Sequence, residues 1–119
     1  MQGFRAPANG DRILIFRRPW LDLVLSGAKT VEVRHRSLRP GQTYYLGCQS
    51  FIYGAAEIGA VVLVTSAEQW TQLAPQHRWD VPAPPYRRTC AHTLANVVRA
   101  PVPLSYWHPR GAVGVVLYR

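Results

Sequence analysis

The segment from Gly54 to Thr65, GAAEIGAVVLVT, limits the folds that this chain can adopt. After Glu57 it is apolar at consecutive positions, so a strand formed here is expected to be buried on both faces. Gly54 and Gly59 permit the sharp curvature that a small barrel requires. The apolar part is too short to span a bilayer as a helix. The segment therefore predicts the curved central strand of a small β-rich domain.

Further strands and two helices are predicted around this strand. Pro19 is placed to open a helix that Gly27 ends, and Ser66 is placed to cap a second helix, with Gln69 completing a capping box. The other strand candidates share short apolar or alternating patterns and cover residues 12–16, 30–34, 43–49, 92–99 and 112–118. This order predicts a mainly β domain with two helices (α+β), whose sheet forms a small closed or nearly closed β-barrel.

The remaining segments set the domain boundaries. Residues 1–11 are polar and contain Pro and Gly, which predicts a flexible N-terminal tail before a single domain over residues 12–119. Residues 76–89 are Pro-rich and irregular, and residues 101–110 resemble a turn-rich crossover. Apolar residues make up 48% of the chain and charged residues 17%, which is typical of a packed domain.

The charge balance favours a polyanionic partner. The chain has 14 Lys and Arg residues against 6 Asp and Glu, for a net charge of +8. Such a domain attracts nucleic acid at long range, and salt weakens the attraction. No basic amphipathic helix or lipidation motif points to a membrane. The first residues contain no apolar run, and Cys48 and Cys90 are expected to be free thiols, so a cytoplasmic location is expected.

Three charged residues follow the first predicted helix. Lys29 lies in the turn after Gly27, and Glu32 and Arg34 project from one strand face about 7 Å apart. A cation, an anion and a planar guanidinium that converge on one spot can hold a phosphate or the polar edge of a base. The alternative is a solvated strand face with an ion pair contributing about 0–1 kcal/mol. As a turn residue, Lys29 is expected to contribute little to stability.

These residues form a recognisable motif. Gly27-x-Lys29-x-x-Glu32-x-Arg34 resembles the GxKxxExR signature of the ASCH family, within the PUA-like superfamily. The preceding Arg18–Trp20 segment, Arg-Pro-Trp, resembles the Gln-Pro-Trp or Gln-Pro-Tyr of many members, with arginine in place of the common glutamine. The resemblance covers about residues 12 to 118.

The resemblance implies a PUA-like barrel with a cleft beside the first helix. Family members are thought to bind RNA or DNA, so we expect recognition of RNA or another single strand, or of a nucleotide or modified base. Lys29 and Arg34 would contact phosphate or an acceptor edge, while Glu32 would orient Lys29 or accept from a base amino group. The further ligand-binding candidates are aromatic or basic residues near the motif or in the Pro-rich loop: Arg17, Arg18, Trp20, Arg36, Arg87 and Arg88.

Two other classes of function stay open. One branch of the family is an amidohydrolase on acetylated cytidine, and another member is described as a ribonuclease. A hydrolase would use Lys29, Glu32 and Asp80, although the amidohydrolase carries a threonine nucleophile at the position of Glu32. A carboxylate there would form an unstable anhydride, so binding is favoured over catalysis. The third class is an adaptor that binds protein through the Pro-rich loop.

The histidines and aromatic residues complete the candidates. Cys90, His92 and His77 lack the paired spacing of a structural zinc site, so no metal and no cofactor are predicted. The aromatic residues in periodic segments are predicted to be core, namely Trp20, Tyr45, Trp70 and Tyr118. Those in or near loops are candidates for a base-stacking surface, namely Tyr53, Trp79, Tyr86, Tyr106 and Trp107.

Overall fold

One mixed sheet of six strands organises the computed structural model, which describes residues 3–119. The strands lie in the order β2-β5-β4-β3-β1-β6, and β1 runs parallel to β3 while the other neighbouring pairs are antiparallel. The elements in chain order are β1 (Arg12–Ile15), α1 (Trp20–Ser26), β2 (Val31–Arg34), β3 (Thr43–Cys48), β4 (Phe51–Val64), α2 (Ala67–Gln72), α3 (Ala74–His77), β5 (Thr89–Ser105) and β6 (Val115–Leu117).

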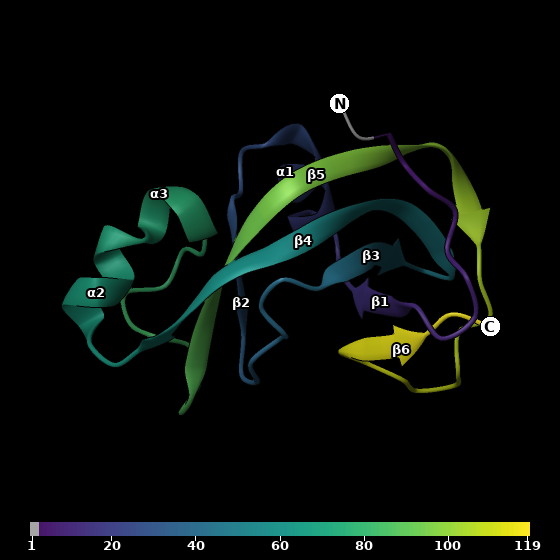
Figure 1. The fold of residues 1–119 in the computed structure, drawn as a ribbon. Helices are drawn as coiled ribbons and strands as arrows, with labels where there is room; N and C mark the ends of the chain where they lie inside the picture. The colour runs from purple at the N-terminus through teal and green to yellow at the C-terminus, as the bar shows by residue number, and fades with distance from the viewer. Residues whose placement is uncertain (1–2) are drawn as a thin grey trace.

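The two longest strands, β4 and β5, run side by side along the length of the molecule, with α2 and α3 at one end and β6 towards the other (Figure 1). Their register shifts at three places, and the paired strands bend there. At Gly54 the strands approach so closely that a Cβ atom would overlap the carbonyl oxygen of Val98. The prediction of a curved central strand is confirmed. The prediction of burial on both faces is wrong at its end, where Val62 and Leu63 are 44% and 47% exposed.

The sheet does not close into the predicted barrel. Among residues 3–119, no ladder joins its two outer strands, β2 and β6. Both are short, with four and three residues, so neither presents enough backbone to complete a ring of hydrogen bonds. The sheet is therefore open between β2 and β6, and the candidate site lies at this opening.

Within residues 3–119, three helices form instead of the predicted two. Gly27 ends α1 in the left-handed conformation at φ 84°, as predicted. Ser66 caps α2 by accepting a hydrogen bond from the Gln69 N–H, and the Gln69 side chain accepts from the N–H of Thr65. The additional helix α3 follows α2 directly, and its last two residues, Gln76 and His77, fall in the segment predicted to be irregular.

Strand β5 is longer than predicted and includes Pro101 and Pro103. Both prolines are exposed and fall between the registered pairs Arg99–Gly54 and Leu104–Ile52. They lie beyond the stretch of β5 that pairs with β2, so the missing N–H groups interrupt no ladder on that side. The predicted crossover is consequently confined to the residues after Ser105.

Part of the predicted N-terminal tail lies against the sheet. The Phe4 ring packs edge-on against Tyr45 at 5.8 Å, and the Tyr45 hydroxyl donates to the carbonyl of Arg5. Residues 1 and 2 of the predicted tail lie outside the described residues. No helix within residues 3–119 is long and apolar enough to cross a bilayer.

In the part of the chain that the structure describes, the buried side chains form three clusters, and the third supports the site. The first lies beneath α1 and the second between β1, β3 and β6. The third joins β2 to the helices at the end of β4, with Leu73 and Trp79 packed against it, and its buried members are Val31, Val33, Val64, Trp70 and Ala91.

Candidate functional site

Glu32 lies between two cations at the start of β2. Its Oε1 atom is 3.7 Å from Lys29 Nζ, and its Oε2 atom accepts a hydrogen bond from Arg34 Nε at 2.6 Å. Gly27 ends the helix early enough to place Lys29 in the following turn, and alternation along β2 puts Glu32 and Arg34 on one face. The structure thus brings together the three residues of the charged motif.

Lys29 is buried, in contrast to the expectation for a turn residue. Its side chain has no exposed surface, and Nζ donates a hydrogen bond to the carbonyl oxygen of His77 at 2.5 Å. Nζ also lies 5.1 Å from the centre of the Trp20 ring. Burial lowers the pKa of Lys29 to about 8. Lys29 therefore supports Glu32 from behind and ties the turn to α3.

Arg34 connects the open edge at β2 to β1. Besides Glu32, its guanidinium donates through Nη2 to the carbonyl oxygen of Ile15 at 2.7 Å, and it lies 5.2 Å from the centre of the Phe16 ring. A side chain thus bridges the opening that backbone hydrogen bonds leave. About a fifth of the Arg34 side chain stays exposed, at 19%.

His92 is a supporting residue that the sequence indicated only as a weak metal candidate. Its Nε2 atom accepts from the N–H of Leu38, so Nδ1 carries the proton and donates to the backbone oxygen of Glu32. The ring is fully buried, and burial lowers its pKa. His92 therefore fixes the backbone at Glu32 together with the segment that follows β2. An inward-facing histidine opposite Glu32 on the paired strand is the signal that identifies it.

Three aromatic residues, Trp20, Trp79 and Tyr86, form an aromatic wall. This wall lies beside the charged cluster of Lys29, Glu32 and Arg34. The rings of Trp20 and Trp79 stack at 5.5 Å with an angle of 17°, and Tyr86 meets Trp79 edge-on at 6.0 Å. Trp20 was predicted both as core and as a ligand contact. It is only partly buried and borders the cleft. Its role as a ligand contact stays a prediction.

His77 holds this wall in place. Its Nδ1 atom accepts from the N–H of Trp79, so Nε2 carries the proton and donates to the carbonyl oxygen of Trp70. The His77 ring also stacks on Trp70 at 3.7 Å, and burial lowers its pKa. The sequence offered no direct signal for this role, because it depends on a short helix that places His77 beneath Trp79.

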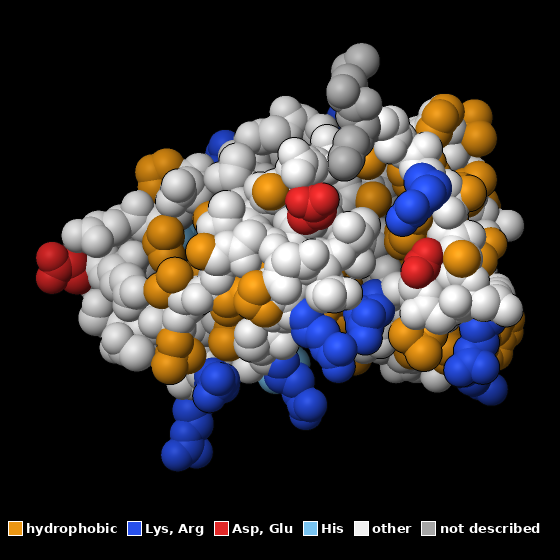
Figure 2. All heavy atoms as spheres, in the orientation of Figure 1, with side chains coloured by type: hydrophobic (Ala, Val, Ile, Leu, Met, Phe, Trp, Pro, Cys, Tyr) orange, Lys and Arg blue, Asp and Glu red, His pale blue; other side chains and the backbone are white. Residues whose placement is uncertain are grey.

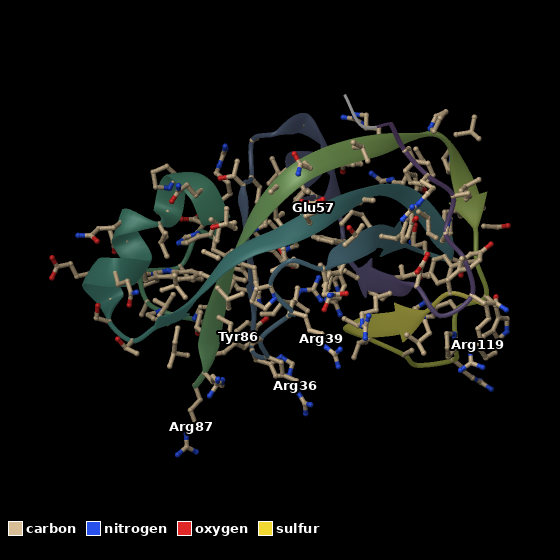
Figure 3. The ribbon with its side chains drawn as sticks, in the orientation of Figure 1. Arg36, Arg39, Glu57, Tyr86, Arg87 and Arg119 are labelled. Atoms are coloured by element: carbon tan, nitrogen blue, oxygen red, sulfur yellow. The ribbon has the colours of Figure 1, made fainter. Side chains whose placement is uncertain are left out.

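The cleft occupies about 930 Å³ at the opening between β2 and β6. The aromatic wall and residues Val113, Gly114 and Val115 both contribute to its lining. Its lining combines the charged pair of Glu32 and Arg34 with aromatic rings and four further arginines. The other residues of this kind in the lining are Arg12, Phe16, Arg17, Trp20, Arg36, Arg39, Trp79 and Tyr86. Arg36 and Arg39 point away from the ribbon on one side of the molecule (Figure 3).

The other predicted site residues lie elsewhere. Arg18 pairs with Asp22 and lies 5.0 Å from the centre of the Tyr53 ring, which turns it away from the cleft lining. Arg87 and Arg88 border a separate hollow. Asp80 is exposed and does not line the cleft, although its neighbour Trp79 does.

The potential metal ligands are dispersed or occupied. Within residues 3–119, no group of three or more His, Cys, Asp and Glu side chains is placed to hold a metal ion. His77 and His92 each use both ring nitrogens in hydrogen bonds to the protein. Cys48 and Cys90 are buried free thiols.

Comparison with solved structures identifies the fold. The chain superposes on the ASCH protein from Zymomonas mobilis with a TM-score of 0.72, at 14% identity over 92% of this chain and 88% of the other. A serine-to-alanine variant of that protein gives a TM-score of 0.68, with 96% of this chain and 92% of the other covered. A tyrosine-to-phenylalanine variant gives a TM-score of 0.69, with 92% and 91% covered, and both variants are 14% identical to this chain. No family model and no curated protein matches the sequence. The chain therefore has the ASCH fold.

Proposed function

We propose that this protein is an ASCH-type domain that binds single-stranded nucleic acid, and RNA in particular, through the cleft between β2 and β6. The observation that carries the proposal is the juxtaposition in one cleft of a buried carboxylate, Glu32, and the stacked rings of Trp20 and Trp79. The ASCH fold and the charged motif support the assignment, because members of that family are thought to bind RNA or DNA.

The size and the aromatic wall suit a nucleotide. Ligand clefts usually measure about 300–1,000 Å³, so the volume of this one suits a nucleotide. An unpaired base can stack on the aromatic wall, and each such contact contributes about 1–3 kcal/mol regardless of sequence. Base-paired strands do not offer these faces, because their bases stack on one another.

The charged pair provides polar recognition at the floor of the cleft. Glu32 is held as an acceptor by Arg34 and Lys29, so it can accept a hydrogen bond from the amino group of a base. Arg34 uses two donor atoms within the protein, Nε and Nη2, and its other donors can reach a phosphate or an acceptor edge. The two groups thus have different roles: the carboxylate accepts a hydrogen bond from the base, and the guanidinium donates to the phosphate or to an acceptor edge.

Arginines at the rim supply the long-range attraction. Arg12, Arg17, Arg36 and Arg39 border the cleft, and the chain carries a net charge of +8. Figure 2 shows basic side chains projecting along one edge of the molecule, the edge where Figure 3 labels Arg36 and Arg39. Binding that depends on such contacts weakens as salt rises, with a slope of about −0.7 per phosphate contact for a single strand.

The test is fluorescence anisotropy with a labelled single-stranded RNA, a DNA of the same sequence and the RNA duplex, each at 50 and 250 mM salt. We expect affinity in the micromolar range or weaker, a preference for single strands and a steep loss with salt. Arg36→Gln should weaken binding several-fold and make the salt slope about 0.7 shallower. Arg119→Gln removes the same charge at the C-terminus, far from Arg36 in Figure 3, and should change little. Affinity that salt leaves unchanged would contradict the proposal and favour an adaptor.

A further inference from the structure

A second hollow adjoins the cleft. It occupies about 630 Å³ and is formed by the end of β4 and the segment before β5. Its lining residues are Leu63, Val64, Thr65, Pro84, Tyr86, Arg87 and Arg88. Of these, only Tyr86 also borders the cleft. The two hollows are thus neighbours separated by one aromatic side chain.

Tyr86 is a fixed divider. Its N–H donates to the hydroxyl of Thr89 at 3.1 Å, and that hydroxyl donates back to the Tyr86 carbonyl at 2.9 Å. Thr89 is fully buried at the start of β5. The Tyr86 ring contacts Trp79 on the cleft side and lies 5.7 Å from His35, yet 38% of the residue stays exposed. The hydrogen bonds to Thr89 therefore hold the backbone of Tyr86 at the start of β5, and the ring lies between Trp79, His35 and solvent.

The second hollow combines an apolar surface with cations. Leu63 is 47% exposed and borders the hollow, so its side chain provides apolar surface there. Arg87 and Arg88 are exposed, and the ion pairs within residues 3–119 involve Arg18, Lys29 and Arg34 instead. An apolar face beside two uncompensated guanidinium groups suits a base and its phosphate.

The cations continue from one hollow to the next. Arg39, Arg36 and Arg87 project on the same side of the molecule (Figure 3), and Tyr86 borders both hollows. A phosphodiester backbone needs positive charge along its path, whereas a mononucleotide needs it only at its one phosphate group. The continuity of charge across Tyr86 thus favours a strand over a free nucleotide.

Building on the proposed function, we infer that the ligand is an oligonucleotide that crosses Tyr86. One nucleotide occupies the cleft over Glu32, and its neighbour occupies the second hollow, with its phosphate against Arg87 and Arg88. Tyr86 separates the two bases and offers each a ring edge or face. A free nucleoside or mononucleotide fills only the cleft and leaves this second set of contacts unused.

The experiment is calorimetric titration with a nucleoside monophosphate, the corresponding dinucleotide and a pentanucleotide. The variants are wild type, Arg87→Gln/Arg88→Gln and, as a control with the same charge loss, Arg110→Gln/Arg119→Gln. Both control arginines are exposed and border neither hollow. Circular dichroism and melting temperature verify that each variant is folded.

We expect wild-type affinity to increase at least tenfold from mononucleotide to pentanucleotide. Arg87→Gln/Arg88→Gln should lose most of this gain and make the salt slope about 1.4 shallower, while binding the mononucleotide as the wild type does. A pentanucleotide affinity equal to wild type in this variant would overturn the second subsite but leave the proposed function intact, provided that Arg36→Gln still weakens binding. Binding of poly-glutamate but of no oligonucleotide would overturn both.

Discussion

Lys29 Nζ donates a hydrogen bond to the carbonyl oxygen of His77, so the turn before β2 is tied to the end of α3. Three further contacts complete a closed circuit with this bond. The Trp79 N–H donates to the His77 ring, and Trp79 stacks on Trp20, whose ring in turn lies 5.1 Å from Lys29 Nζ. The charged cluster and the aromatic wall are therefore one structural unit, and a change in either should be felt in the other.

Lys29→Met should destabilise the protein by about 1–3 kcal/mol at pH 7, because the buried carbonyl of His77 loses its donor. Glu32 keeps Arg34 as a partner, so the variant should still fold. Urea denaturation followed by fluorescence measures the difference. A free energy of unfolding equal to wild type would mean that water replaces the lysine, and would contradict the closed circuit.

The free energies of unfolding of the wild type and of Lys29→Met should differ more at alkaline pH than at neutral pH. The pKa of Lys29 is lowered to about 8 by burial, so between about pH 8 and 10.5 the unfolded chain keeps a proton that the folded chain has released. The Lys29 contribution to the free energy of unfolding therefore rises with pH in this window. At about 1.4 kcal/mol per pKa unit, the difference between wild type and Lys29→Met should widen by up to about 3 kcal/mol. A constant difference would refute the shift.

Trp79→Ala should reduce affinity for single-stranded RNA about tenfold or more, because the cleft loses the ring that stacks on Trp20. Trp107→Ala is the matched control, since Trp107 is 63% exposed and does not border the cleft. Anisotropy titrations of both variants at one salt concentration give the comparison. Equal losses in the two variants would show that the aromatic wall has no specific role.

Acidification should destabilise the protein at the aromatic wall, because His77 becomes protonated there. Burial lowers the pKa of His77, so the ring contributes stability above its ordinary value of 6.5, and this contribution is lost as pH falls through the folded-state pKa. His77→Gln removes this titration and leaves that of His92, whose pKa is lowered in the same direction. Between pH 7 and 5 the variant should therefore lose less stability than wild type. Parallel losses in urea denaturation would exclude His77 as the source.

The parts of the site that depend on local pattern were predictable from the sequence. Strict alternation along Val31–Arg34 places Glu32 and Arg34 on one face, and Gly27 sets where the preceding helix ends. The convergence of both residues with Lys29 follows from the lengths of one turn and one strand. These distances span few residues, so neighbouring elements alone determine them.

The features that were missed depend on distant contacts. The burial of Lys29 is set by His77, which is far away in sequence, and α3 is too short for its pattern to distinguish it from a loop. Barrel closure depends on whether β2 and β6 meet, and neither strand encodes that register. Pro101 and Pro103 argue against a strand, yet they are tolerated where β5 lacks β2 as a neighbour.

The protein should release little or no acetate from acetylated cytidine. A hydrolase of this kind needs a nucleophile or an activated water, and a proton donor for the leaving amine. Glu32 is engaged by both neighbouring cations, and an anhydride formed on it would be unstable. Asp80 is exposed outside the cleft, so it is not placed to activate water there. Lys29 could donate a proton, but it has no exposed surface and does not border the cleft.

Liquid chromatography of the nucleoside after prolonged incubation measures this activity, with Glu32→Gln and Asp80→Asn as the informative variants. The wild type should not exceed the background rate measured without protein. Turnover near 1 per second, which is ordinary for enzymes, would place the hydrolase above the binding domain if Glu32→Gln abolished it. If Asp80→Asn abolished it as well, the segment after α3 would have to fold over the cleft when substrate binds, because Asp80 is exposed and lies outside the cleft lining.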